Sequence, residues 1–216
     1  MQKQNIENYL KTIYHLSNGN SFVVTNKQLS ALLNVIPATV TEAVKKLDAL
    51  KLVSYEKSYG IKLTSQGVKQ ALTVIRRHRI WETYLALELG FGWEEVHELA
   101  EELEHIKNDK LILKLIQKLG DPAYDPHGEP IPDARGNFKK NEYIKLADTK
   151  LNKEYKLMAT TDTTTIFLKF LDKNNLKIGA FLKVLEIETV DGSVLIGTTL
   201  NPVRLSSQMA QNLLVK

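Results

Sequence analysis

The sequence of 216 residues contains no cysteine, which excludes disulfide bridges and thiolate metal ligands. No apolar run approaches the roughly 18 residues that a membrane-spanning helix needs. The first ten residues, MQKQNIENYL, lack the apolar core of a signal peptide. Glycine-rich phosphate loops and the H-E-x-x-H motif of metalloproteases are also missing. We therefore expect a cytoplasmic protein without a membrane partner.

Charge is unevenly distributed along the chain, although the net charge is only +4. Residues 1–79 hold 12 Lys and Arg against 4 Asp and Glu, whereas residues 80–130 hold 4 against 12. Residues 131–216 hold 13 against 9. A basic first third indicates a polyanionic partner, most simply double-stranded DNA. An acidic middle third indicates bound cations.

The first 65 residues have the pattern of a winged helix-turn-helix. Apolar residues recur at helical spacing over 5–17, 26–33 and 38–50. Two alternating stretches, 52–56 and 61–64, predict a β-hairpin wing. In the last of the three helices, the side chains expected to face inward are Val40, Val44, Leu47 and Leu50.

The second helix of a helix-turn-helix pair enters the major groove by its N-terminal residues. The residues expected to reach bases are Ala38, Thr39, Thr41 and Glu42. The residues expected to contact phosphates are Lys45, Lys46, Lys57 and Lys62. A winged helix used for protein contacts is the alternative interpretation.

The acidic middle third centres on a helix predicted over 94–106. His97, Glu101 and His105 follow one another at steps of four, and Glu104 lies between the last two in angle. Imidazoles and carboxylates on one face suit first-row divalent metals, whereas the simpler interpretation is a solvated acidic face. Because eight residues rise about 12 Å, this face is too long for one ion. Two ions fit better, one held by Glu101, Glu104 and His105, the other by His97 with His78 and Glu82 of the preceding helix.

The remaining segments complete a mainly α chain with a β C-terminal part. A helix over 110–119 carries more apolar residues than one buried face needs, which favours a homodimer interface. The Pro- and Gly-rich segment 120–132 holds two further potential ligands, Asp125 and His127. Residues 133–150 have the composition of a linker. The sheet pattern that follows is expected to form a small barrel from strands 155–160, 181–189 and 193–200, with a helix near 164–172.

The motifs resemble the diphtheria-toxin-repressor family of metal-dependent transcriptional regulators along the whole chain. The resemblance is carried by NYLKTIYHL (8–16), by residues 39–67, by RRHRIWE (76–82), by WEEVHELAEELEH (93–105) and by DPHGEPIP (125–132). It implies a winged-helix domain over 1–65, a helical dimerisation and metal-binding domain over 66–140 and an SH3-like domain over 150–216. Such regulators bind operator DNA as metal-loaded homodimers and repress metal-uptake genes.

The resemblance also implies further ligands. Asn8 would complete the first site with Glu101, Glu104 and His105, and Asp162 would supply the second site from the C-terminal domain. Asp125 falls where some members have a cysteine near the first site. Glu101 stands where iron-responding members have cysteine, which favours Mn(II), then Fe(II), with Zn(II) binding in vitro. Asn8 departs from the family pattern, because manganese members have aspartate there and iron members have methionine.

Two other functions fit parts of the sequence. Glu94-x-x-His97 and Glu102-x-x-His105 match the Glu-x-x-His motif of di-metal enzymes. Those enzymes need the two motifs on different helices, so an enzyme is disfavoured. The neutral amide of Asn8 leaves open a winged-helix regulator that senses an organic ligand or has lost metal control.

Overall fold

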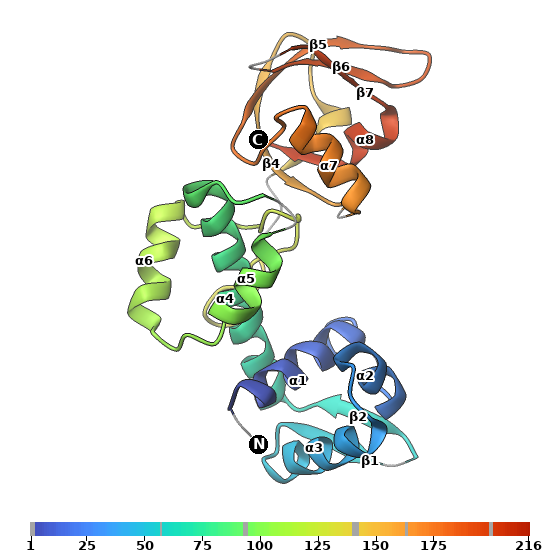
Figure 1. The fold of residues 1–216 in the computed structure, drawn as a ribbon, viewed down its shortest axis with the longest axis vertical. Coiled ribbons are helices and arrows are strands. Elements are labelled where there is room, and N and C mark those ends of the chain that lie inside the picture. Colours follow the sequence, from blue (N-terminus) through green and yellow to red (C-terminus); the bar gives the residue numbers. More distant parts are fainter. Residues whose placement is uncertain (1–2, 57, 93–94, 140–142, 163, 199–200) are drawn as a thin grey trace. The chain divides into compact units, whose positions relative to one another are not determined.

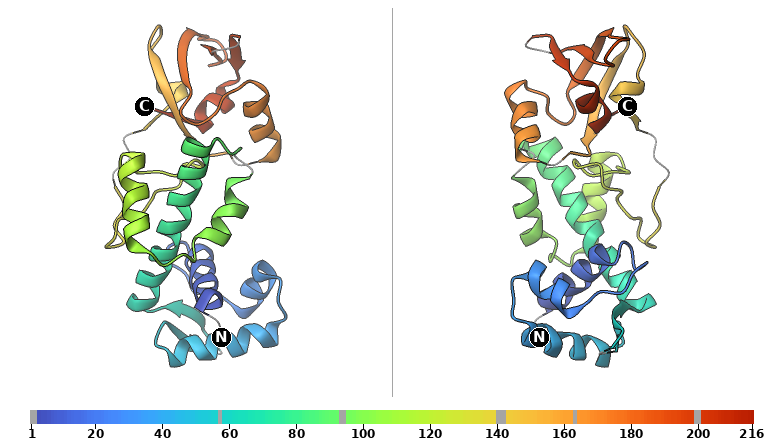
Figure 2. Two further views of the ribbon diagram at one scale, coloured as in Figure 1. Left: turned by 60° about the vertical axis from the view of Figure 1, so that its left-hand side comes forward. Right: turned by 90° about the vertical axis from the view of Figure 1, so that its right-hand side faces the viewer.

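The computed structural model describes residues 3–56, 58–92, 95–139, 143–162, 164–198 and 201–216 (Figure 1, Figure 2). The chain divides into two compact units, Met1–Arg77 with Pro132–Asn137, and His78–Ile131 with Phe138–Lys216. Helix α4 (Ser65–Leu89) belongs to both, because the division falls between Arg77 and His78. In the described part of the chain, no helix is both long and apolar enough to span a membrane.

The first unit is a winged helix-turn-helix, as predicted. Its elements in chain order are α1 (Lys3–Leu16), α2 (Asn26–Leu33), α3 (Pro37–Ala49), β1 (Val53–Glu56), β2 (Gly60–Leu63) and the first half of α4. The wing is an antiparallel hairpin in which Val53 pairs with Leu63 and Glu56 with Gly60. Lys57, a predicted phosphate contact, lies outside the described residues.

Local signals fix the helix ends of the winged-helix unit. Thr25 caps α2 in a capping box with Gln28, and Asn34 ends it in the left-handed region at φ 51°. Pro37 opens α3, where its missing N–H has no helical partner to lose. The inward position predicted for Leu50 is wrong. That side chain is 52% exposed, because α3 ends one residue before it.

Helix α4 begins at Ser65 and contains a glycine in its first turn for a packing reason. A Cβ on Gly67 would lie 1.9 Å from the carbonyl oxygen of Leu52. Only glycine therefore lets the start of α4 approach the residue before the wing so closely. The Gly67 N–H donates to the Thr64 hydroxyl, which satisfies one of the free donors of the first turn.

The second unit adds two short helices, α5 (Val96–Leu103) and α6 (Asp109–Leu119). The prediction of a single helix reaching residue 106 is wrong, because α5 ends at Leu103. The backbone turns after Leu103, where Glu104 N–H still donates to Ala100 and Ile106 N–H donates to Leu103. Asn108 caps helix α6, and its side chain accepts from Leu111 N–H.

The C-terminal part is an antiparallel sheet with two helices packed on it (Figure 1). Its strand order is β3-β8-β4-β5-β6-β7. The elements in chain order are β3 (Ile144–Lys145), the 3-10 helix η1 (Leu146–Asp148), β4 (Glu154–Thr160), α7 (Thr165–Lys173), β5 (Phe181–Ile187), β6 (Val194–Gly197), β7 (Val203–Leu205), α8 (Ser207–Asn212) and β8 (Leu213–Val215). Strands β4, β5 and β6 and helix α7 confirm the predicted pattern, whereas β3, β7 and β8 were not predicted. The predicted linker is therefore partly structured, and Leu146 within it is fully buried in the sheet core.

Candidate metal centre

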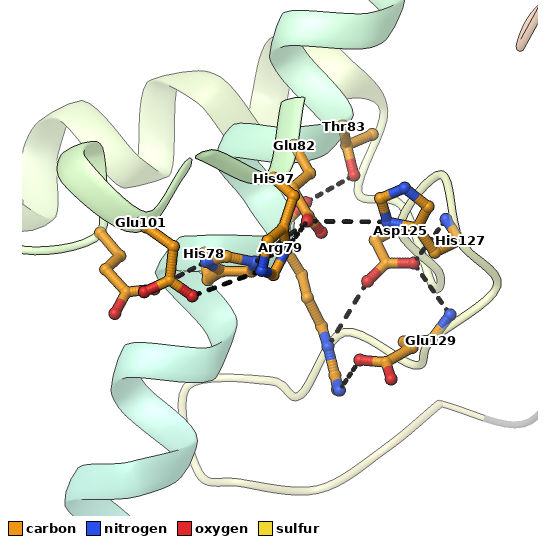
Figure 3. Close-up of polar contacts among 10 residues, drawn as sticks. His78, Arg79, Glu82, Thr83, His97, Glu101, Asp125, His127 and Glu129 are labelled. Atoms are coloured by element: carbon orange, nitrogen blue, oxygen red, sulfur yellow. Dashed lines mark hydrogen bonds and ion pairs between the residues drawn. The ribbon is translucent and has the colours of Figure 1, made fainter. Parts of the chain in front are cut away.

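The potential ligands of the second unit come from α4, α5 and the loop after α6 (Figure 3). His78 and Glu82 lie one turn apart on α4, and both are buried. His97 on α5 has a side chain that is 60% exposed, so the cluster opens to solvent there. Asp125 and His127 approach from the loop, and Asp125 is only 1% exposed. We call the ligand cluster the set His78, Glu82, His97, Glu101, Glu104, Asp125 and His127.

Three donor atoms of the ligand cluster form a compact triangle. Glu82 Oε1 lies 3.0 Å from His78 Nε2 and 3.1 Å from His97 Nδ1. The two histidine nitrogens are 3.2 Å apart. Adjacent ligands of an octahedral ion, each about 2.2 Å from it, lie about 3.1 Å apart. The spacing therefore fits three ligands of one first-row divalent ion, and these are the three residues grouped from the sequence.

The other predicted group, Glu101, Glu104 and His105, is divided in the structure. Glu101 lies with His78 and His97, since one ligand atom from each falls within 4.8 Å of the others. Glu104 is fully buried, and its Oε2 lies 2.6 Å from His78 Nδ1. His105 Nε2 lies 3.9 Å from the other Glu104 oxygen. Glu104 therefore connects His105 to the imidazole ring that takes part in the triangle.

A second set of ligand atoms surrounds the same Glu82 carboxylate. Glu82, Asp125 and His127 each offer an atom within 4.8 Å of the other two, and His127 Nδ1 is 3.6 Å from Glu82 Oε1. The structure thus places Asp125 beside Glu82, in the half of the cluster that the sequence assigned to the second ion. His127 was named in the sequence only as a potential ligand. Glu82 is the residue common to both sets, which the sequence did not indicate.

Loop geometry holds Asp125 in place. Its Oδ1 accepts the backbone N–H groups of His127 and Glu129, and its other oxygen lies 3.5 Å from Arg79 Nε. Arg79 also pairs with Glu129 and donates to the carbonyl of Pro130. The alternation Asp125-x-His127-x-Glu129 in a Pro- and Gly-rich segment was the available sequence signal, because Asp side chains commonly bond the backbone two residues on.

The two facing carboxylates have pKa values shifted in opposite directions. Burial raises the pKa of Glu82, but hydrogen bonds from His127, His78 and His97 outweigh burial and hold it well below its ordinary value. Burial raises the pKa of Asp125 to about 7, and the negative charge of Glu82 adds to this shift. The guanidinium of Arg79 and the ring of His127 oppose it only in part. A cation between the carboxylates would therefore compete with the proton that Asp125 holds below about pH 7.

The two further residues implied by the resemblance belong to different units, Asn8 to the first and Asp162 to the second. Asn8 lies on α1 in the first unit, where its Oδ1 is buried and has no hydrogen-bond partner among the described residues. Asp162 follows β4 and accepts hydrogen bonds from the backbone and hydroxyl of Thr164. Within the described residues, Asp162 belongs to neither set of adjacent ligand atoms.

Those predicted DNA-contact residues that the structure describes lie on α3 and on β2. Ala38, Thr39 and Glu42 are exposed, whereas Val40 between them is buried. Thr41 is half-buried, and its hydroxyl donates to Pro37 and accepts from Asn26. The charged residues with exposed side chains are Lys45, which pairs with Glu42 at 3.1 Å, Lys46 and Lys62.

Known protein families match most of the two helical parts. Residues 1–61 match the iron dependent repressor N-terminal DNA binding domain, and residues 64–133 match the iron dependent repressor metal binding and dimerisation domain. The diphtheria toxin repressor of Corynebacterium jeikeium (strain K411) is 33% identical over 126 residues, which is 58% of this chain and 52% of that protein. The chain thus spans about half the length of that curated relative.

Solved structures match nearly the whole chain. A manganese-dependent transcriptional repressor in complex with manganese has a TM-score of 0.64 and 31% identity, and the match covers 97% of this chain and 98% of that one. ScaR with bound Zn²⁺ has a TM-score of 0.60 and 32% identity, over 98% and 99% of the two chains. The similarity therefore includes the C-terminal sheet as well as the two helical parts.

Proposed function

Because the chain belongs to the iron-dependent repressor family, whose members are DNA-binding repressors and not enzymes, we propose that it is a metal-dependent repressor that binds operator DNA as a homodimer. The observation that carries the proposal is the triangle of donor atoms from His78, Glu82 and His97. The same chain carries a winged helix with an exposed α3 surface. A cation site and a DNA-reading unit are thus joined through α4.

We propose Mn(II) as the physiological ion, with Fe(II) next and Zn(II) as an ion that binds in vitro. The cluster offers imidazole nitrogens and carboxylate oxygens, and the sequence contains no cysteine. Hard oxygen donors favour Mn(II) over softer ions. Similar proteins have been solved with manganese and with zinc, which supports a divalent ion of this class.

The proposed ligands differ in the contacts that support them. His78, Glu82 and His97 form the triangle, and the residues within reach of it are Glu101, Glu104, Asp125 and His127. His105 follows through its contact with Glu104. Asn8 and Asp162 stay predictions from the family resemblance.

Helix α4 provides a physical link from metal binding to DNA binding. When bound, a divalent ion supplies the positive charge that holds Glu82, Glu101 and Glu104 together. In its absence these carboxylates repel one another, and the ligand-bearing half of α4 is less restricted. The other half of α4 packs in the winged-helix core through Ala71. With an ion held by these residues, the DNA-competent population would be favoured. By linkage, operator DNA would then tighten metal binding by the same factor, typically about 5- to 150-fold.

The proposed DNA interface is the N-terminal part of α3 with the wing. Bases would be read by Ala38, Thr39, Thr41 and Glu42, and phosphates would be contacted by Lys45, Lys46, Lys57 and Lys62. The homodimer is supported by the matched dimerisation domain and by apolar side chains left exposed on the helical part, such as Leu113, which is 57% exposed. We further propose that the protein acts in the cytoplasm on metal-uptake genes.

The proposal is tested by fluorescence anisotropy of labelled operator DNA, selected from the genomic regions of candidate uptake genes. Titrations are run with Mn(II), Fe(II), Zn(II) and chelator. We expect affinity to rise by at least tenfold with Mn(II) or Fe(II). Equal affinity with and without metal would overturn the metal-dependent function and would favour a regulator that senses an organic ligand or has lost metal control.

A further inference from the structure

Three arginines of α4 that contribute to the basic charge of the first third are engaged within the protein. Arg76 donates to the carbonyl of Pro132, and Arg79 faces the carboxylate of Asp125. Arg77 forms an ion pair with Glu7 of α1, with 2.9 Å between Nη2 and Oε1. Both side chains of this pair are about nine-tenths buried, with 8% and 10% exposed. The motif RRHR is therefore a set of internal contacts, and the pair with Glu7 has no role in the function proposed above.

Both residues of the Glu7–Arg77 pair are sequence neighbours of proposed metal ligands. Arg77 immediately precedes His78, a member of the donor triangle, and Glu7 immediately precedes Asn8. Neighbouring side chains on a helix point about 100° apart. Arg77 can therefore contact α1 while His78 contacts Glu82 and His97. A small rotation or shift of α4 at His78 must move Arg77 with it.

Stability alone does not account for this pair. A buried ion pair often contributes no more to folding than apolar residues of similar volume, although removing one partner is costly. Arg77 Nε is also buried and has no hydrogen-bond partner among the described residues, which is a further cost. The guanidinium is thus held in one geometry by Glu7 without being fully satisfied.

We propose that Glu7 and Arg77 form a positioning pair that fixes α1 to α4 and passes the metal-bound state of the ligand cluster to the winged-helix unit. Helix α1 contributes Tyr9, Leu10 and Ile13 to the core on which α3 packs. A shift of α4 at the ligand cluster would reach that core through the pair. This inference depends on the proposed metal-dependent function.

The experiment compares two neutral double variants in the full chain. E7Q/R77Q removes the buried charges, and E186Q/R204Q removes an exposed Arg–Glu pair of the C-terminal sheet, whose side chains are 48% and 44% exposed. Three quantities are measured for each protein: Mn(II) affinity by calorimetry, thermal unfolding, and operator affinity with Mn(II) and with chelator. The metal response is the ratio of the last two affinities.

We expect E7Q/R77Q to bind Mn(II) within threefold of the wild type but to lose at least tenfold in metal response. E186Q/R204Q should keep the wild-type response. If E7Q/R77Q does not fold, E7L/R77M replaces the pair with apolar residues of similar length and is expected to fold with the same loss of response. R77K retains the charge and should recover part of the response.

Two results would overturn the inference. A folded double variant with the full metal response would show that the pair is structural only. Loss of Mn(II) binding in parallel with the response would place its effect on the ligands instead of on the connection. A wild-type protein that shows no metal response would overturn the proposed function itself, which the wild-type titration detects separately.

Discussion

The winged-helix unit and the ligand cluster bury opposite kinds of side chain. The core of the first unit is apolar, and residues such as Leu10, Ile13 and Leu47 are fully buried in it. The ligand cluster instead buries Glu82 and Glu104 beside the ring of His78. Apolar burial is favourable without a partner, whereas buried carboxylates cost free energy unless protons, hydrogen bonds or cations compensate them. The apolar core of the first unit therefore needs no cation, whereas the ligand cluster depends on protons, hydrogen bonds or a cation to offset its buried carboxylates.

The largest effect is expected from opening a cavity in the apolar region. Leu47→Ala should cost about 2–5 kcal/mol of folding free energy, because a fully buried leucine loses both its transfer energy and its packing. Operator binding should fall with it, while Mn(II) binding by the ligand cluster should remain. Urea unfolding and calorimetry measure the two. Leu50→Ala is the control, since Leu50 is 52% exposed near the end of the same helix. Equal destabilisation by both variants would contradict the comparison.

The converse experiment removes the charge that both sets of ligand atoms share. Glu82→Gln keeps the volume but loses the carboxylate that faces His78, His97 and His127. We expect Mn(II) affinity to fall by about 100-fold, which is about 2.7 kcal/mol, with little change in the urea unfolding of the winged-helix core. Glu88→Gln, on the same helix, should change neither. Retained Mn(II) affinity in Glu82→Gln would exclude the triangle as the metal site.

The winged helix and the ligand cluster also differ in how much of each the sequence could predict. Apolar periodicity and strand alternation were sufficient for the winged helix, because those signals are local, as are the Thr25 cap of α2 and Pro37 at the start of α3. The donor triangle was also predicted, since His78 and Glu82 are one helical turn apart. Asp125 was not placed beside Glu82, because the 42 intervening residues include the end of α4, two further helices and a loop without periodicity.

Two other features could not be predicted from the sequence, namely which arginines are buried and where the short strands lie. The basic balance of the first third includes Arg77 and Arg79, which are buried and paired with Glu7 and Asp125. Strand β8 is only three residues long, yet it lies between β3 and β4 in the sheet. Such features depend on partners far along the chain, and neither composition nor periodicity records those partners.

The stability of the metal-free protein as a function of pH tests the opposite pKa shifts of Asp125 and Glu82 in the ligand cluster. The folded state raises the pKa of Asp125 from 3.8 to about 7, mainly through burial. The folded protein therefore holds this proton more tightly than the unfolded chain. The resulting stability is present below about pH 4 and is lost as pH rises toward 7. The pKa of Glu82 shifts the other way, so its contribution is present above its ordinary value of 4.5 and is lost as pH falls below that value toward the lower pKa of the folded state.

Asp125→Asn isolates the Asp125 contribution, because asparagine resembles the protonated acid. We expect the melting temperature of the metal-free variant to fall less between pH 5 and pH 8, on the order of a few degrees less, than that of the wild type. Glu98→Gln is the control, because it removes an exposed carboxylate of α5. Identical pH profiles for Asp125→Asn and the wild type would show that Asp125 does not hold the proton.

The smallest effect is expected on the exposed surface of the winged-helix unit, where no buried group is disturbed. Lys46 is exposed on α3, so Lys46→Ala should leave folding and Mn(II) affinity unchanged. If Lys46 neutralises one phosphate per protomer, the slope of log affinity against log salt should decrease by about 0.9 per contact, and by about twice that in a dimer. Specificity between operator and mutated operator should not change, because a phosphate contact carries no base information. Lys173→Ala, at the exposed end of α7, is the matched control. An unchanged salt slope for Lys46→Ala would show that Lys46 is not part of the DNA interface. The wing would then be the expected phosphate-binding surface, and Lys62→Ala would test it.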